Sequence, residues 1–443
     1  MKRSLSATTL LFASVSAILG SGWLFTAQLT AKNAGPAAII SWLIGGAAVV
    51  IIAFVFAELS SMIPITGSST RIPQYTHGSI VSFIFSWMIW LSYAGLVAAE
   101  VQAVIQSTSY YLPSLINASG AASDGNLSTL GYLAAAGLML IISIINIFSL
   151  RWLMKCNNVL TLLKIIIPFV VAGIVLYHKF SFHNVIHPAD QPFSPYGFHG
   201  ILSAIASGGI LFAFNGFKQS CEMAGEAKNP SKTLPFAIIG SITITLTIYL
   251  VLQFTFASSL TAANLRNGFG GLHLASPFPT ILAQDKLQAL NPLLTIGAIL
   301  GPLAAALMYM SSAGRSLYGS STNGYLPTFL QKLNPQGNPL YGIGFSFLLG
   351  MLMFTQMHSW QVMAEFLNLL MALSYAIAPV CLLTLRRQLP QQRRPFRLPC
   401  AYLWANLAFI LCNLITYFTG WDIISKLCIA LIAGVIILFS YHR

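Results

Sequence analysis

The apolar segment 201–224 carries polar residues near its middle. Asn215, Gly216 and Lys218 stand there among phenylalanines. A lysine in hydrocarbon costs about 2.5–3.5 kcal/mol, and Asn and Gly are poor helix formers. Inside a membrane such a sequence is tolerated where the helix unwinds beside a water-filled cavity rather than lipid. The sequence therefore predicts a broken membrane helix at this place.

A second interruption of the same kind lies near the N-terminus. Gly20, Ser21 and Gly22 interrupt the apolar run 10–29. A broken helix exposes free N–H groups on one half and free C=O groups on the other, which suit the carboxylate and the ammonium of an α-amino acid. Glycines also allow close helix packing. Two such interrupted spans in corresponding places of two halves favour a transporter binding site.

The composition indicates how many helices surround these breaks. The chain of 443 residues is 56% hydrophobic and only 7% charged, whereas soluble domains carry about 25% charged residues. A spanning helix needs roughly 20 apolar residues, so we expect an all-α polytopic membrane protein with about twelve spans and no separate soluble domain. The expected spans are 8–31, 36–63, 79–112, 130–150, 157–177, 200–224, 234–259, 292–318, 341–357, 362–385, 402–419 and 422–441.

The distribution of basic residues predicts the orientation. With the N-terminus in the cytoplasm, most of the 22 Lys and Arg residues fall on the cytoplasmic side, as expected for membrane proteins. The basic residues on the outer side are Lys32, Lys179, Arg266, Lys286 and Lys426. We therefore expect an even number of spans with both termini in the cytoplasm of a plasma (inner) membrane protein. This bias also explains the net charge of +13 without a nucleic-acid partner.

Several further stretches form a recognisable set with the two breaks. They are 57–64 (AELSSMIP), 212–217 (FAFNGF), 224–230 (AGEAKNP) with Pro235, Arg315 with 323–327 (NGYLP), and 394–399 (RPFRLP). As a set they resemble the amino acid–polyamine–organocation superfamily of transporters, over nearly the whole chain. The resemblance implies a single transporter domain, 1–443, that works by alternating access. It consists of inverted repeats at 8–177 and 200–385, with broken first and sixth helices, followed by two additional helices in 386–443.

The resemblance places the substrate at the two breaks. The expected substrate-binding residues are Gly20, Ser21, Gly22, Trp23, Phe212, Ala213, Phe214, Asn215, Gly216, Phe217 and Lys218. Lys218 stands where the family often has a glutamate, which favours an acidic substrate, and the surrounding sequence most resembles the aspartate–proton symporter branch. Alternatively, Lys218 extends to a vestibule or pairs with Glu222, one helical turn on. The aromatic residues could equally fill the core.

Four other residues are candidates for coupling and gating. Burial disfavours the charged form of a lysine, so Lys164 in the fifth span could carry a proton; in proton-coupled members of the family a lysine of this span stands where sodium-coupled relatives bind their ion. Glu100 is an acid within the third span, a functional candidate by default. Each could instead be interfacial or structurally paired. We expect Glu58 to hold a cytoplasmic gate with Arg71 or Arg151.

These observations favour a secondary active transporter that imports amino acids, coupled to protons and preferring acidic ones. The alternative is an exchanger of neutral or cationic amino acids or amines. A membrane-embedded enzyme is disfavoured because the histidines lie in loops or at span ends, with no catalytic or metal cluster at membrane depth. We expect an amino acid, protons and membrane lipids as partners, and no cofactor, metal or nucleic acid.

Overall fold

The computed structural model describes residues 3, 5–117, 126–148, 150–180, 182–186, 192–274, 277–284, 286–357, 359–418 and 420–441. These residues are helical almost throughout, and no β-strand is formed among them beyond two isolated bridges. The all-helical architecture confirms the all-α part of the expected fold class.

Each expected span coincides with one helix or with a group of consecutive helices. The α-helices are α1 Ala7–Ile18, α2 Gly22–Ala34, α3 Ala38–Met62, α4 Ser68–Thr108, α5 Thr129–Phe148, α6 Leu150–Lys179, α7 Phe182–Ile186, α8 Gly197–Ala206, α9 Ile210–Ala213, α10 Gln219–Glu222, α11 Pro230–Ser259, α12 Pro277–Gln284, α13 Asn291–Thr322, α14 Leu340–Gln356, α15 Trp360–Gln388, α16 Ala401–Tyr417 and α17 Trp421–Tyr441. Within the described ranges, eight helical segments are long and apolar enough to cross a membrane, and four more are apolar but shorter.

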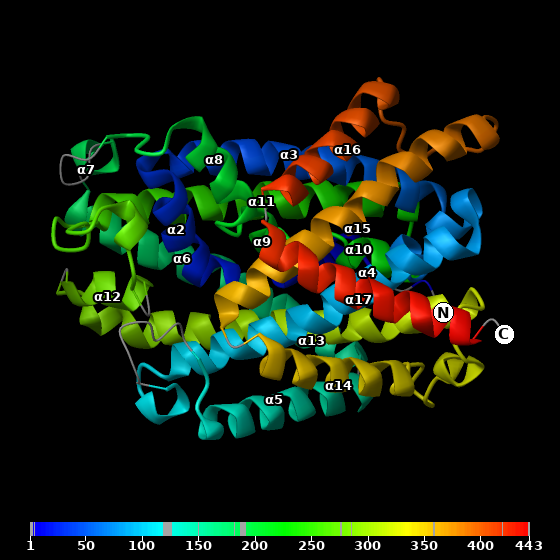
Figure 1. Ribbon diagram of the computed structural model, residues 1–443, viewed down its shortest axis with the longest axis horizontal. Helices are drawn as coiled ribbons and strands as arrows, with labels where there is room; N and C mark the ends of the chain where they lie inside the picture. The colour runs from blue at the N-terminus through cyan, green and yellow to red at the C-terminus, as the bar shows by residue number, and fades with distance from the viewer. Residues whose placement is uncertain are drawn as a thin grey trace.

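The short helices α9 and α10 lie near the centre of the bundle (Figure 1). The long helices α4 and α13 pack against each other, α3 packs against α11, and α1 contacts α6, α11 and α13. At one end of the bundle lie α7 and α12, which we call the α12 end. Both chain ends are marked at the opposite end, which we call the terminal end.

A helical stretch precedes the expected third span. That span was expected to begin at residue 79, but α4 starts at Ser68 and bends sharply at Gly78, whose φ of 73° and ψ of −170° are not helical. Glycine adopts a positive φ without the steric penalty of a Cβ. The residues 68–77 are too polar to show the apolar pattern of a membrane span, which is why the sequence did not predict this piece.

The sixth expected span is broken twice. Gly209 has φ 84° between α8 and α9, and Gly216 has φ 121° between α9 and α10. A Cβ on Gly216 would lie only 2.6 Å from the backbone nitrogen of Ile18 and 2.7 Å from the carbonyl carbon of Ala17. Gly216 therefore allows the second break to touch the end of α1, so that the two predicted breaks meet.

Replacing Gly216 tests this contact. Gly216→Ala should lower the midpoint of thermal unfolding of the purified protein, because alanine adds both a strained positive φ and a clash with α1. Gly137→Ala is the matched control: nothing lies within 4 Å of a Cβ there, and alanine favours a helix by roughly 0.5–1 kcal/mol over glycine. Equal unfolding midpoints for Gly216→Ala and the parent would contradict the close approach.

Candidate functional site

The first break holds a carboxylate from α4. α1 ends at Ile18 and α2 begins at Gly22, and the N–H of Ser21 between them donates to Oε2 of Glu100 at 2.6 Å. Glu100 is only 2% exposed. A Cβ on Gly20 would overlap the Glu100 carboxylate, so the glycine makes room for it. The free amide predicted for the break is thus engaged by an acid of the same chain.

The carbonyl side of the same break carries a cation. Nζ of Lys164, on α6, donates to the backbone oxygen of Ser16 at 2.6 Å and lies 3.2 Å from its hydroxyl. Lys164 is 4% exposed, so it is not the interfacial lysine of the alternative interpretation. The structure therefore brings the two predicted coupling residues, Lys164 and Glu100, to the two sides of one break.

Two tyrosine hydroxyls connect the first break to the second. Each lies within hydrogen-bond distance of one backbone carbonyl from either break. The pairs are Tyr249 of α11 with Ile18 (2.9 Å) and Ala213 (2.8 Å), and Tyr309 of α13 with Ala17 (2.7 Å) and Asn215 (2.8 Å). The sequence did not single out these tyrosines, because a tyrosine in an apolar helix looks like any core aromatic residue. Their only signal is a hydroxyl that needs a partner when buried.

An aromatic cluster covers the first break on the side of the α12 end. The indole N–H of Trp360, at the start of α15, donates to the Ser21 hydroxyl at 2.8 Å. The Trp360 ring centroid lies 4.7 Å from that of Phe25 and 5.3 Å from that of Phe212. Phe212 was predicted near the substrate, whereas Trp360 and Phe25 were not. These three rings pack together beside the first break.

The other predicted aromatic residues pack into separate parts of the core. Trp23 lies 6.1 Å from Phe278 of α12, centroid to centroid, and its indole borders Gly301 of α13. Phe214 lies within 5.8 Å of Trp42 and within 5.5 Å of Tyr249. Phe217 packs against Phe56 and Tyr375, with centroids 5.7 and 5.2 Å away. A direct substrate contact for Trp23, Phe214 or Phe217 stays a prediction.

Lys218 is enclosed by aromatic rings. Its Nζ lies 4.6, 5.5 and 5.8 Å from the ring centroids of Tyr375, Tyr93 and Phe56, and the residue is 1% exposed. It does not extend to a vestibule. Within the described part of the chain it also forms no ion pair with Glu222, whose carboxylate instead accepts from the Tyr93 hydroxyl at 2.9 Å.

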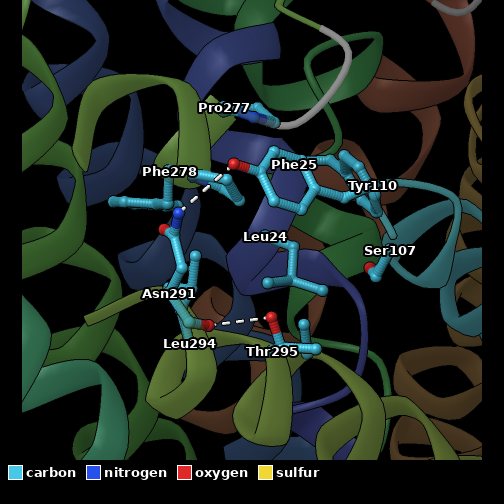
Figure 2. Close-up of a pocket in the computed structure, with 11 residues that line it drawn as sticks. Leu24, Phe25, Ser107, Tyr110, Pro277, Phe278, Asn291, Leu294 and Thr295 are labelled. Atoms are coloured by element: carbon cyan, nitrogen blue, oxygen red, sulfur yellow. Dashed lines mark hydrogen bonds between the residues drawn. The ribbon is translucent and has the colours of Figure 1, made fainter. Parts of the chain in front are cut away.

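A small cavity lies beside α2 toward the α12 end (Figure 2). Leu24 and Phe25 of α2 line it with Tyr110, Phe278 and Asn291, and the Asn291 amide donates to the Tyr110 hydroxyl at 3.4 Å. Its volume of about 20 Å³ leaves room for about one water molecule. This cavity is therefore too small in this conformation to hold an amino acid.

Glu58 binds two arginines that the sequence analysis did not pair with it. Its carboxylate accepts from Nε and Nη2 of Arg386 at 2.9 and 2.6 Å, from the N–H of Leu398 at 2.7 Å, and lies 3.5 Å from Arg394. Arg71 instead lies against Gly319 of α13. The expected pairing of Glu58 with Arg71 is thus not formed, and the side chain of Arg151, the other expected partner, lies outside the described part of the chain. Glu58 instead ties the end of α3 to the last turn of α15 and the segment after it, an arrangement that we call the clamp. Glu58 and both arginines are far apart in sequence, so spacing could not select the pair.

Comparison with known proteins identifies the family. A family model described as amino acid permease matches residues 5–437. The chain belongs to this family. The permease is therefore a transporter rather than an enzyme, integral to the membrane, and its resemblance to the amino acid–polyamine–organocation superfamily is confirmed.

Curated relatives of the permease transport several kinds of amino acid. It is 32% identical to the glutamate/serine transporter AimA of Bacillus subtilis over 100% of this chain and 82% of the relative. It is also 32% identical to the aspartate-proton symporter of the same organism, over 96% of this chain and 81% of the relative. The branched-chain amino acid permease BcaP of Bacillus subtilis is 27% identical over 100% of this chain and 94% of the relative.

The clamp at Glu58 can be tested by removing its charge. Glu58→Gln leaves two arginines facing a neutral amide, and breaking a buried pair by removing one partner costs about 3–5 kcal/mol. We expect a clearly lower unfolding midpoint in the purified permease. Glu365→Gln is the control, because Glu365 is only half-buried and accepts from the neutral Gln361. Equal losses in both variants would argue against a specific clamp.

Bulk at Gly22 should abolish substrate binding. A Cβ there would lie 3.1 Å from Cα and Cβ of Ala213, and the branches of a valine would fill the space between the two breaks. Gly22→Val should eliminate uptake of a panel of labelled amino acids by proteoliposomes while the protein remains monodisperse. Gly344→Val, where nothing lies within 4 Å of a Cβ, should leave uptake intact. Full uptake by Gly22→Val would place the substrate elsewhere.

Proposed function

We propose that this permease imports amino acids by alternating access, coupled to protons, with a preference for acidic substrates. The observation that carries the proposal is the occupied first break. Glu100 accepts from the Ser21 amide on one side, and Lys164 donates to the Ser16 carbonyl on the other. Two groups that can change their charge thus hold the backbone to which the carboxylate and ammonium of an amino acid would bind.

The proposed architecture follows the family resemblance. Twelve helices span the plasma membrane in one domain, 1–443, with inverted repeats at 8–177 and 200–385 and two additional helices in 386–443. Breaks between α1 and α2 and between α9 and α10 lie in the first helices of the two repeats. Both termini lie in the cytoplasm. This orientation is supported by the basic residues of the loops and by the position of both chain ends at one end of the bundle (Figure 1).

Protonation of Glu100 admits the substrate. An ionised carboxylate accepts a stronger hydrogen bond than a neutral one, so a proton on Glu100 weakens its hold on the Ser21 amide. The α-carboxylate of an amino acid then takes this N–H group, as an anion does at a helix N-terminus. Substrate and proton enter together because each favours the displacement of the Glu100 carboxylate from the break.

Lys164 links a second change of charge to helix movement. Its ammonium group connects α6 to the last turn of α1 through the Ser16 carbonyl, and a neutral amine would donate a weaker hydrogen bond. Loss of the proton from Lys164 therefore loosens α1 from α6. Alternating access requires such a change between the helices that carry the breaks and those around them.

The substrate preference is supported by the relatives. The two relatives with 32% identity are named as a glutamate/serine transporter and as an aspartate-proton symporter. Exchange of neutral or cationic amino acids is the second candidate function, and the resemblance to a branched-chain permease along the whole chain favours a neutral substrate. An inward proton gradient separates the two functions, because only a proton symporter accumulates substrate in response to it.

Separating coupling from exchange tests the proposal. Lys164→Met and Glu100→Gln should abolish accumulation driven by an inward proton gradient in proteoliposomes, yet keep exchange of labelled for unlabelled amino acid within about threefold of the parent, since neither change adds bulk at the break. Lys332→Met, which removes an exposed lysine, should accumulate substrate normally. Undiminished accumulation by both variants would leave Lys164 and Glu100 with a structural role only.

A further inference from the structure

Three nitrogen donors at the second break are buried without an acceptor. They are Nδ2 of Asn215, Nζ of Lys218 and Nε2 of Gln219, none of which has a hydrogen-bond partner among the described residues. The exposed fractions of the three residues are 1%, 1% and 0%. Buried polar groups are nearly always hydrogen-bonded, and an unpaired buried cation is especially costly. Oε2 of Glu222, one helical turn after Lys218, is likewise buried without a partner, but it forms no ion pair with the lysine among the described residues. The three donors between residues 215 and 219 therefore indicate that an acceptor belongs beside them.

Neighbouring side chains fix the orientation of the two amides. Oδ1 of Asn215 accepts from the Tyr375 hydroxyl at 2.9 Å, and Oε1 of Gln219 accepts from the hydroxyl of Ser312 on α13. With each amide oxygen engaged, the amide nitrogen is the free end of the side chain. The two amides therefore present donors only, like the ammonium of Lys218.

The rings around Lys218 do not replace an anion. Tyr375, Tyr93 and Phe56 attract the ammonium through their faces, but they leave its N–H groups without oxygen acceptors. Tyr375 also holds the Asn215 amide, so the ammonium and this amide share one tyrosine. The Asn215 carbonyl contacts the Tyr309 hydroxyl, which reaches Ala17 of the first break. The donors thus adjoin the place where the amino acid backbone would bind.

We propose that Asn215, Lys218 and Gln219 form a subsite for a second carboxylate, that of the substrate's side chain. The inference rests on the proposed amino acid transport and names its substrate class as amino acids with an anionic side chain. Lysine neutralises the added charge, and the two amides supply directed hydrogen bonds to the carboxylate oxygens. An uncharged side chain would leave all three donors unpaired, which is a strong basis for discrimination.

The subsite is closed in this conformation. The ring of Tyr375 lies against the Lys218 ammonium, and the three donor residues are fully buried. A substrate carboxylate therefore reaches them only after this ring has turned away from Lys218. When it binds, the carboxylate replaces the ring of Tyr375 as the nearest partner of the Lys218 ammonium.

Substitutions that preserve shape test the subsite. Asn215→Asp and Gln219→Glu exchange a donor for an acceptor and keep the oxygen that Tyr375 or Ser312 needs, while Lys218→Met removes the cation. Uptake of labelled glutamate, aspartate, serine and alanine is measured in proteoliposomes. Each variant should lower the ratio of acidic to neutral uptake by about tenfold or more, because the added or uncompensated negative charge opposes the substrate carboxylate. Gln336→Glu and Lys332→Met make the same charge changes at exposed positions and should keep the parent ratio.

The possible results separate the subsite from transport itself. If all three variants keep the parent ratio, or if Lys218→Met loses acidic and neutral uptake equally while Gln219→Glu keeps the parent ratio, the subsite is refuted and Lys218 is a structural partner of Glu222. If the parent carries neutral amino acids but neither acid, the subsite is again refuted while amino acid import stands. A parent that carries none of the four would overturn the proposed function together with the subsite.

Discussion

Four helices around the centre of this permease, α4, α6, α11 and α13, supply partners to backbone groups that two helix breaks leave free. In an apolar interior an unpaired N–H or C=O group costs several kcal/mol, so an interrupted helix survives only where other side chains reach it. α4 provides Glu100 for the Ser21 amide, and α6 provides Lys164 for the carbonyl of Ser16. Tyrosines of α11 and α13 bond carbonyls of both breaks.

The hydrogen bonds at the two breaks can exchange one partner for another. A hydrogen bond contributes only about 0.5–1.5 kcal/mol net when one partner replaces another, although an unmade bond is expensive. On the proposed mechanism, a substrate that brings its own carboxylate therefore displaces Glu100 from Ser21 at a small net cost. The rings of Trp360, Phe25 and Phe212 pack together beside this break. On the proposed mechanism, paired breaks in an apolar interior are thus both stable and able to change partners.

The sequence predicted local features and missed distant partners. Glycines and polar residues inside apolar runs located both breaks, because helix propensity and burial are properties of neighbouring residues. The pairing of Glu58 with Arg386 joins residues far apart in the chain, and no spacing rule distinguishes Arg386 from Arg71. The helical stretch 68–77 lacks apolar periodicity and was missed for that reason. The roles of Glu100 and Lys164 were proposed singly, since only the folded chain brings them to one break.

On these proposals each of the two breaks has a separate role in transport. The first break carries groups that titrate, Glu100 and Lys164, beside backbone that recognises what all α-amino acids share. The second carries side-chain donors at Lys218 and Gln219, which meet the part of the substrate that differs between amino acids. Because the two sets lie on different helices, substitutions at 215–219 can alter the preferred substrate while the proton-linked contacts persist. Such a separation would allow one scaffold to serve different substrates. The relatives fit this view, since they are named for glutamate and serine, for aspartate, and for branched-chain amino acids.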